Sequence, residues 1–245
     1  MLAVWPESAV PGALTEEKYT RLFEDIAARS GAYQFIGSNV EHETNQYVGA
    51  YLLPPNAAEW QNYRKIKLVP FGEYIPLENL IRSAFKNVEV LGELGAFTPG
   101  PREQKPLDVA GVSVGETICY ESIFPQLWLF QNRQGAKFFV NITNDAWFFK
   151  TAAPYQHLAV NVLRAVETGR PVLRAANTGF SAYIDPFGRI EKQSGLFTQE
   201  ILTASVPLAV GDRQNFYTQF GDWFAWLCAA LFFTLLISTM VFAYE

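Results

Sequence analysis

Residues 109–143 read VAGVSVGETICYESIFPQLWLFQNRQGAKFFVNIT, and they decide the fold class of the chain. Val109–Ile118 is predicted to be a strand, and Lys137–Thr143 a strand of the buried type. Glu121–Asn132, between them, is predicted to be a helix in which Pro125 stands in the first turn. A strand, a helix and a second strand in succession indicate an α/β domain with layered sheets and helices.

The same alternation continues on both sides of this stretch. A helix is predicted over Thr15–Ala28, capped by Thr15 and ended by Gly31, with one apolar face spaced as in a buried helix: Tyr19, Leu22, Phe23, Ile26 and Ala27. Further strands are predicted at 1–4, 33–40, 46–53, 60–68, 172–176, 179–184 and 200–206, helices at 77–85 and 154–168, and loops at 69–76 and 87–105.

Composition narrows the function classes. Hydrophobic residues make up 49% of the chain, which permits a large core, and the net charge of −5 makes it a poor partner for nucleic acid. The 2 Cys exclude a disulfide-rich scaffold, and the 2 His are too few for a His-rich metal site. We find no motif for a metal or a nucleotide and predict no cofactor.

The end of the chain differs from the rest. Residues 223–244 read WFAWLCAALFFTLLISTMVFAY and carry no charge. An α-helix of this length covers roughly 33 Å, enough to cross the hydrocarbon core of a bilayer. Trp223, Trp226 and Tyr244 stand near its ends, as interfacial aromatics do. We predict a transmembrane helix over 223–244 and a water-soluble domain over 1–222, the alternative being a buried core helix.

Three polar residues are candidates for chemistry: Glu7, Lys65 and Cys119. Glu7 and Cys119 follow predicted strands, and ligands of α/β sheets bind beyond the carboxyl ends of strands. A strand-to-helix corner and a nearby Lys would favour the Cys119 thiolate. Glu7 would serve as general base and then as general acid. The Tyr120 N–H, with a Lys ammonium, would stabilise a developing oxyanion. Cys119 also fits a purely structural position at the end of a buried strand, and Glu7 and Lys65 fit surface positions.

Glu73 and Glu121 lie in stretches rich in aromatic and apolar residues, where an unpaired carboxylate is costly to bury. One interpretation is that they pair with Lys65, or orient it and the nucleophile. The other is that both are exposed loop acids. The sequence does not decide between these.

Several motifs together resemble a known family. They are WPES at 5–8, YRKIKLVPFGEYIP at 63–76, ICYES at 118–122 and TNDAWF at 143–148. In this order they are similar to the catalytic domain of bacterial apolipoprotein N-acyltransferases, the membrane branch of the nitrilase, or carbon–nitrogen hydrolase, superfamily. The LVPFGE block is the most family-specific of them.

The resemblance implies an α-β-β-α sandwich followed by one C-terminal transmembrane helix. It implies Glu7 as general base, Lys65 as the ammonium that stabilises the oxyanion and Cys119 as nucleophile. Glu73, Tyr120 and Glu121 match supporting positions around the site, and Trp147 matches an aromatic near the acyl pocket. Lys65 is chosen over Lys67 by the family's Tyr-x-Lys register, because strand parity does not separate residues two apart.

The resemblance also implies a reaction and a place in the cell. Cys119 would take an acyl chain from a membrane phospholipid as a thioester, and the α-amine of a diacylglyceryl-cysteine apolipoprotein would then accept it as an amide. The domain would face the periplasm from the bacterial inner membrane.

Some features depart from the family pattern. Family members carry several membrane helices ahead of this domain, and their fold begins with a strand and helix before WPE. We therefore expect 1–222 to be a catalytic domain without its first βα unit, with a newly open sheet edge. Phe149 also stands where the family usually has Gly.

Two other functions remain compatible with the sequence. One is a membrane-tethered amide hydrolase of the wider superfamily, with water as acyl acceptor. The other is an inactive fragment that retains the fold. A lipid-sized groove beside Cys119 would favour the acyltransferase, and loss of geometry among Glu7, Lys65 and Cys119 would favour the fragment.

Overall fold

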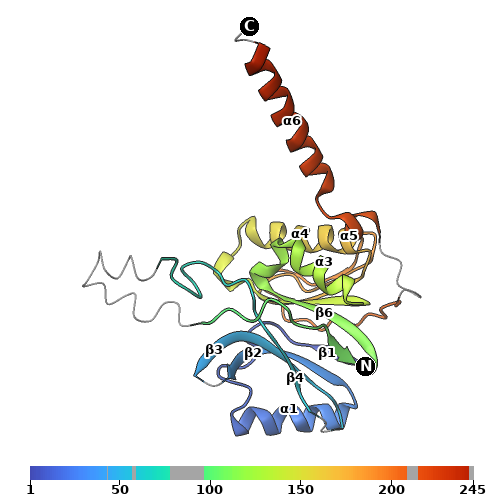
Figure 1. The fold of residues 1–245 in the computed structure, drawn as a ribbon. Helices are drawn as coiled ribbons and strands as arrows, with labels where there is room; N and C mark the ends of the chain where they lie inside the picture. The colour runs from blue at the N-terminus through green and yellow to red at the C-terminus, as the bar shows by residue number, and fades with distance from the viewer. Residues whose placement is uncertain (43, 57–58, 78–96, 209–214, 243–245) are drawn as a thin grey trace.

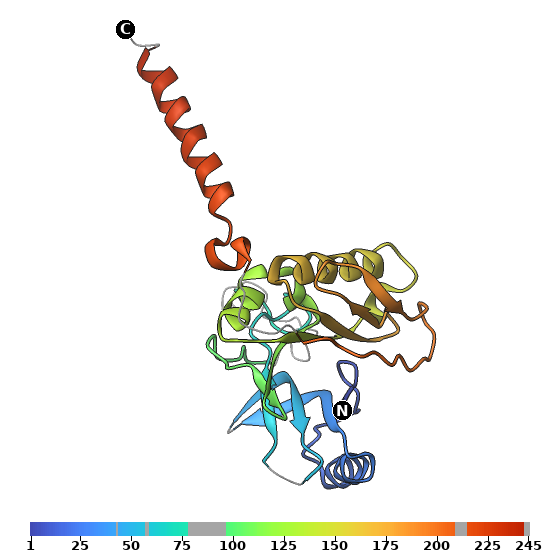
Figure 2. The same cartoon turned by 90° about the vertical axis from the view of Figure 1, so that its right-hand side faces the viewer.

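Two β-sheets lie face to face between layers of helix, with α1 on one side and α3 and α4 on the other (Figures 1 and 2). This computed structural model describes the chain except residues 43, 57–58, 78–96, 209–214 and 243–245. The arrangement is the predicted α-β-β-α sandwich, followed by a long C-terminal helix, α6.

The first sheet has the strand order β1-β2-β3-β4. Its strands are β1 Leu2–Val4, β2 Tyr33–His42, β3 Asn45–Leu53 and β4 Gln61–Arg64. β1 runs parallel to β2, and the other pairs are antiparallel. β1 therefore stands at the edge of this sheet.

The second sheet has the order β10-β9-β8-β7-β6-β5. Its strands are β5 Leu107–Val109, β6 Val112–Ile118, β7 Phe138–Asn144, β8 Val172–Asn177, β9 Ala182–Ile184 and β10 Ile190–Gln193. The central strands β6, β7 and β8 are parallel. Their carboxyl ends therefore meet at one edge of the sheet, where α/β proteins place their ligands.

Helices cover the outer faces of both sheets: α1 Glu17–Ser30 lies over the first, and α3 Pro125–Arg133 and α4 Ala153–Thr168 lie over the second. The short α5 Phe216–Phe220 follows, and α6 Trp223–Phe242 projects away from the domain (Figures 1 and 2). Two 3₁₀ helices, η2 Cys119–Ile123 and η3 Ala146–Phe148, follow β6 and β7. The helix predicted from Glu121 begins four residues later, because η2 comes first. Pro125 stands in its first turn, as predicted, and is its first residue, where its missing N–H leaves no bond unmade.

The apolar core is divided into three parts by the layers. Between the sheets, alternate residues of facing strands pack together, including Phe35, Leu52, Val114, Ile118, Val140 and Ile142. Between the second sheet and its helices the core includes Trp128, Phe139, Leu158, Ala165 and Ile184. Between the first sheet and α1 it includes Leu14, Phe23, Ile36, Tyr51 and Leu53. Phe139 and Val140 face opposite sides because successive residues of a strand do so.

The single strand predicted over Val109–Ile118 is wrong, because a hairpin divides it. Val109 pairs with Val112, and the two residues between them, Ala110 and Gly111, have φ values of 54° and 81°. Positive φ at both central positions is the geometry of a tight two-residue hairpin. Ala before Gly is an uncommon sequence for this turn, which is why the pattern read as one strand.

The strand predicted over 60–68 ends early, at Arg64. The Lys65 N–H still donates to the Val48 carbonyl of β3, at 2.8 Å. The two N–H groups after it, those of Ile66 and Lys67, bond to a side chain instead: both donate to Oε1 of Glu121, at 2.6 and 3.0 Å. Lys65 therefore sits just past the strand, in a segment shaped by the active-site region of the other sheet.

The strand predicted over 200–206 is also wrong. Exposure alternates along this segment as it would in a strand, and Ile201 is 95% exposed, but its backbone enters neither sheet. The strand β10 was missed because all four of its residues are exposed and none is aromatic. The helix predicted over 77–85 and much of the loop over 87–105 lie outside the described residues.

The first helix begins two residues later than predicted. Its N-cap is Glu16, without a side-chain cap, so the predicted cap by Thr15 is wrong, as is the burial of Leu22. Gly31 ends the helix as predicted, at φ 62°, a conformation that favours glycine. α6 confirms the long apolar helix: residues 223–240 are apolar enough to cross a membrane, and none of that window is buried against the domain.

Candidate active site

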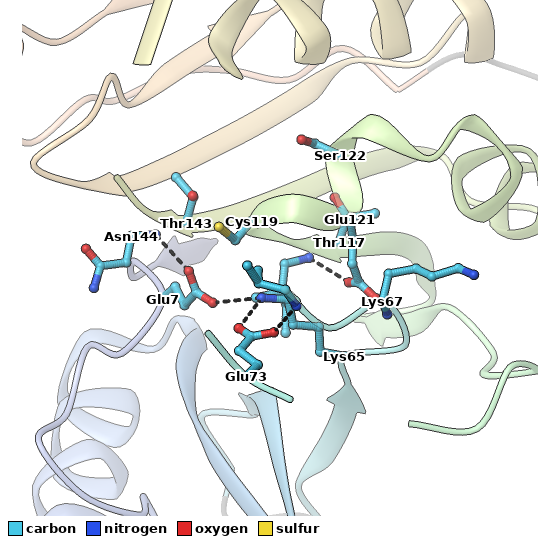
Figure 3. Close-up of polar contacts among 12 residues, drawn as sticks. Glu7, Lys65, Lys67, Glu73, Thr117, Cys119, Glu121, Ser122, Thr143 and Asn144 are labelled. Atoms are coloured by element: carbon cyan, nitrogen blue, oxygen red, sulfur yellow. Dashed lines mark hydrogen bonds and ion pairs between the residues drawn. The ribbon is translucent and has the colours of Figure 1, made fainter. Parts of the chain in front are cut away.

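Three chain segments that end strands bring the predicted site residues together (Figure 3). Glu7 follows β1 and Lys65 follows β4, both of the first sheet, while Cys119 follows β6 of the second. The close-up shows the Cys119 sulfur pointing toward the space that holds Glu7 and Lys65. The site is therefore built between the two sheets, with the acid and the amine on one and the thiol on the other.

Lys65 is fully buried between two carboxylates. Its Nζ lies 3.4 Å from Oε1 of Glu7 and 2.6 Å from Oε1 of Glu73. Burial alone lowers the pKa of Lys65, but the negative charges around it, Glu7 foremost, outweigh burial and raise that pKa. Lys65 is therefore a fixed ammonium ion. Lys67, two residues on, is exposed, with its ammonium 5.4 Å from the centre of the Phe124 ring.

Glu7 is held from both sheets. Its Oε1 faces Lys65, and its Oε2 accepts a hydrogen bond of 2.8 Å from the backbone N–H of Asn144, at the end of β7. The loop that carries Glu7 lies directly on Gly37 of β2, where an added Cβ would stand 2.6 Å from the Glu7 Cα. A side chain at position 37 would displace the acid.

Cys119 occupies a strained corner between β6 and η2. Its φ is 51°, in the left-handed region that costs a non-glycine residue about 1–3 kcal/mol and that clusters at functional sites. Burial first, and then the charge of Glu7, raise the pKa of the Cys119 thiol to about 12, against the opposing effects of Lys65 and Thr143. The predicted thiolate is thus wrong for the resting site, which holds a neutral thiol and needs a base to activate it.

Glu121 and Glu73 are not exposed loop acids. Glu73 pairs with Lys65 directly and also accepts the N–H of Val69 at 2.8 Å, which ties its loop to the site. Glu121 is fully buried and makes no bond to the Lys65 side chain. Its carboxylate accepts hydrogen bonds from the backbone on both sides of the site. The donors are the N–H groups of Ile66 and Lys67, which follow Lys65, and the N–H of Ile118, which precedes Cys119. The Tyr63 hydroxyl donates a further bond, at 3.1 Å. Glu121 thus orients the backbone that presents both the amine and the thiol.

The other two supporting candidates lie at the rim. The ring of Tyr120 stacks edge-on against Phe124, with centroids 5.1 Å apart. Trp147 lies in η3 and is 81% exposed, so its role at an acyl pocket stays a prediction. Phe149, which replaces a family Gly, adopts φ 48° and ψ −153°, a region that is essentially restricted to glycine.

A second buried network was missed by sequence reasoning. The His157 Nε2 lies 3.1 Å from the Cys119 carbonyl oxygen and 3.0 Å from the Ser122 Oγ, and its Nδ1 lies 2.9 Å from Oδ1 of Asp145. Asp145 is also paired with Arg174 at 2.9 Å. Burial alone would raise the pKa of Asp145, but the hydrogen bond from His157 and the charge of Arg174 outweigh burial and lower that pKa. His157 therefore reaches the backbone of the cysteine and not its sulfur.

The signal for this network was present but pointed elsewhere. Asp145 belongs to the TNDAWF motif and His157 to the helix after it, yet their partners lie in other elements, Arg174 in β8 and Cys119 with Ser122 in η2. The presence of only 2 His in the sequence argues against a His-based triad. It does not exclude a His that contacts the backbone carbonyl of the nucleophile, as His157 does.

We expect His157→Leu to slow alkylation of Cys119 by iodoacetamide about tenfold at neutral pH, because the imidazole contacts with the Cys119 carbonyl and the Ser122 hydroxyl are lost. His157→Gln should restore much of the rate, since its amide can reach one of the same partners. Ser122→Ala, which removes only the hydroxyl partner, is the control. Equal rates in all variants, measured by intact mass over time, would rule out a positioning role for His157.

The arrangement supports acyl transfer through a covalent intermediate. It combines a thiol, a carboxylate placed to move a proton and a fixed ammonium beside them. Within the described part of the chain, no group of three or more His, Cys, Asp or Glu side chains is arranged to hold a metal ion.

Comparison with known proteins places this chain in a class. Residues 1–214 match the carbon–nitrogen hydrolase family, and the chain belongs to it. Solved structures agree in fold: a carbon–nitrogen hydrolase from Helicobacter pylori G27 has a TM-score of 0.60 at 14% identity, covering 81% of this chain and 74% of that one. An amidase of the nitrilase superfamily from Nesterenkonia AN1, in a cysteine-to-serine mutant, has a TM-score of 0.58 at 21% identity, covering 80% and 74%.

Within that class, the curated relatives are apolipoprotein N-acyltransferases, which confirms the resemblance stated from the motifs. The protein of that name from Geobacter metallireducens is 40% identical over 234 residues, which are 94% of this chain and 44% of that protein. The one from Nitrosomonas europaea is 46% identical over 138 residues, 56% of this chain and 27% of that protein. The chain spans less than half the length of these relatives.

Proposed function

We propose that this chain carries the catalytic domain of an apolipoprotein N-acyltransferase. The domain would move a fatty acyl chain from a phospholipid to the N-terminal amine of a diacylglyceryl-cysteine apolipoprotein. The observation that carries the proposal is the buried Glu7–Lys65–Glu73 cluster facing the Cys119 thiol, in a chain whose relatives bear this name. The apolar helix α6 fits a reaction in which both substrates are lipids.

The first half-reaction forms a thioester. As the Cys119 sulfur attacks the ester carbonyl of the phospholipid, Glu7 accepts the thiol proton. The carbonyl oxygen becomes negative beside the Lys65 ammonium, which stabilises it. The C–O bond then breaks, and the lysophospholipid oxygen leaves with the proton that Glu7 returns.

The second half-reaction forms the amide. The α-amine of the apolipoprotein attacks the thioester carbonyl, and Glu7 takes a proton from the nitrogen. The C–S bond breaks, and the proton passes to the sulfur, which restores the Cys119 thiol. A base is needed in the first half because the raised pKa of Cys119 keeps the thiol protonated, and in the second half because the amine nitrogen must lose a proton as it becomes an amide.

In this proposal Glu73 holds Lys65, Glu121 sets the backbone of both reactive residues, and Tyr120 and Trp147 border the entrance. The protein would sit in the bacterial inner membrane by α6, with the catalytic domain on the periplasmic side.

The test is intact-mass analysis of the full chain in vesicles that contain phosphatidylethanolamine. The expected result is a mass gain of one fatty acyl group in the parent and none in Cys119→Ala. A peptide with an N-terminal diacylglyceryl-cysteine should discharge the adduct and become acylated, whereas an amide hydrolase would discharge it to water with release of free fatty acid. An inactive fragment would give no adduct under conditions in which an established family member forms one, and that outcome would remove the proposal.

A further inference from the structure

Helix α4 has its polar and apolar sides exchanged relative to an ordinary surface helix. Its buried positions include four polar side chains, those of His157, Asn161, Arg164 and Thr168. Its exposed positions carry no charge and are mostly apolar: Tyr155, Gln156, Ala159, Leu163 and Val166. A helix that faces water normally shows the opposite pattern.

The helix on the other side of the sandwich shows what a water-facing surface looks like in this protein. The exposed positions of α1 are dominated by charged side chains: Glu17, Lys18, Arg21, Glu24, Asp25 and Arg29. The two outer faces of the domain therefore differ in chemistry, and only the α1 face matches water.

The outer side of α4 borders a shallow apolar groove of about 480 Å³. Tyr155, Ala159, Val162 and Leu163 form one wall, and Ile190 of β10 forms the other. The β9–β10 hairpin beside it exposes Phe187 by 75%. The groove lining carries no charge, although the hairpin beside it also exposes Arg189, Glu191 and Lys192. An apolar lining of this kind marks a contact with another apolar body.

The position of α6 shows which body this is. In both views α6 leaves the domain on the side of α3, α4 and α5, and α4 lies across the direction in which α6 runs (Figures 1 and 2). A bilayer crossed by α6 would therefore lie over the α4 layer and not over α1.

The base of α6 is fixed to that layer. Asn215 donates to the Glu167 carbonyl at the end of α4 at 2.7 Å, and Arg133 of α3 donates to the Thr218 carbonyl at 2.9 Å. Beside these bonds, the ring of Phe216 contacts Phe220 and Trp223, at centroid distances of 4.6 and 5.6 Å. Exposed aromatics at the end of an apolar helix are typical of the membrane interface.

We propose that the outer face of α4, together with the α5 aromatics, rests on the lipid bilayer and fixes the orientation of the catalytic domain. The opposite end of α4 carries His157, which contacts the Cys119 backbone, and follows the exposed Trp147 and Phe149. With the outer face of α4 on the membrane, the Cys119 corner lies beneath the N-terminal end of that helix, on the side turned away from the bilayer. The inference relies on the proposed insertion of α6 but not on the chemistry at Cys119.

The experiment measures contact with lipid at single positions. In full-length chains carrying Cys119→Ser and Cys228→Ser, one cysteine is introduced at Ala159, Leu22 or Leu235 and labelled with the fluorophore NBD. Leu22 is the matched control because it is an exposed apolar residue on α1. Leu235 lies in α6 and reports insertion by itself. The vesicles contain phosphatidylethanolamine and phosphatidylglycerol with a doxyl-labelled lipid as quencher.

We expect the label at 159 to be quenched severalfold more strongly than the label at 22, and the label at 235 most strongly. Quenching at 235 with equal quenching at 159 and 22 would overturn the inference while leaving the membrane anchor intact. A second outcome would also overturn the inference, in favour of a second copy of the chain on this face. In that case the label at 159 is shielded from aqueous iodide but not quenched by lipid, and its shielding increases with the density of protein in the vesicles.

A functional arm separates this surface from the chemistry. Leu163→Glu should slow acylation of Cys119 from vesicle phospholipid severalfold and leave its alkylation by iodoacetamide unchanged. Leu22→Glu should change neither rate. Loss of alkylation in Leu163→Glu would show damage to the site and would contradict a role confined to docking.

Discussion

Replacing Lys65 by Met is expected to abolish the acyl adduct on Cys119, whereas the same replacement at Lys67 is expected to leave it intact. The Lys65 ammonium is fully buried between Glu7 and Glu73, and it is the cation that an oxyanion at the Cys119 thioester would meet. Removing one oxyanion-stabilising group costs about 10²–10³ in rate. Here the loss is larger, because two carboxylates are left facing each other without a cation.

Lys67→Met is the matched control for this prediction. The Lys67 side chain is exposed, and only its backbone N–H, which the substitution keeps, takes part in the Glu121 network. Intact-mass analysis measures the adduct, and circular dichroism during heating shows whether each variant is folded. Glu7→Gln, which keeps the shape of the acid, provides a second route if Lys65→Met unfolds, and it too should form no adduct. Adduct on Lys65→Met but not on Lys67→Met would show that the assigned register is wrong.

Replacing Glu121 by Ala is expected to lower the free energy of unfolding of the domain by about 3–5 kcal/mol. The change leaves four donors without an acceptor: two buried ones, the Ile118 N–H and the Tyr63 hydroxyl, and two partly buried ones, the N–H groups of Ile66 and Lys67. Each unpaired buried donor costs about 1–3 kcal/mol, and water entering the vacated space recovers part of the sum. Denaturant unfolding followed by tryptophan fluorescence measures the loss.

The same residue makes stability depend on pH. Burial raises the pKa of Glu121 to about 7, above the value of about 4.3 for an unfolded Glu, so the folded state holds the proton more tightly. The stabilisation that proton binding at Glu121 gives the folded state is fully present below about pH 4.3, and it is lost as the pH rises through about 7. Glu121→Gln should make this decline shallower. Glu116, whose pKa burial also raises, contributes a decline that the variant retains. A steeper decline in Glu121→Gln would show that the sign is wrong.

Much of the fold was predictable because it follows from local patterns. The buried run before Asn144 and the apolar face of α1 each predict their element without reference to the rest of the chain. The errors arose where a distant partner decides the structure. The strand at Arg64 does not continue because Glu121, far along the chain, takes the N–H groups of Ile66 and Lys67. Residues 200–206 keep a strand pattern without a place in either sheet.

The candidate site, like the fold, was predictable only in the parts that local motifs determine. Motifs identified Glu7, Lys65 and Cys119, and the structure brings them together. Neither motif nor spacing predicted that Asn144 would hold Glu7 or that His157 would hold the Cys119 carbonyl, since these bonds join segments that only the folded sandwich brings together. The protonation of Cys119 was also beyond the sequence, because it depends on how deeply the sulfur is buried.

The layered construction makes the distance between base and nucleophile a property of the whole sandwich. Lys65 follows a strand of one sheet and Cys119 a strand of the other, and Glu7 bridges them through its contacts with Lys65 and with the Asn144 N–H. A small sliding of one layer over the other would therefore change the geometry among all three residues. Side chains such as Leu52 and Val140, which fill the space between the sheets, therefore act as spacers for catalysis. Trimming them should reduce turnover at temperatures well below those that melt the domain, so that loss of activity reports on interlayer packing before any loss of secondary structure.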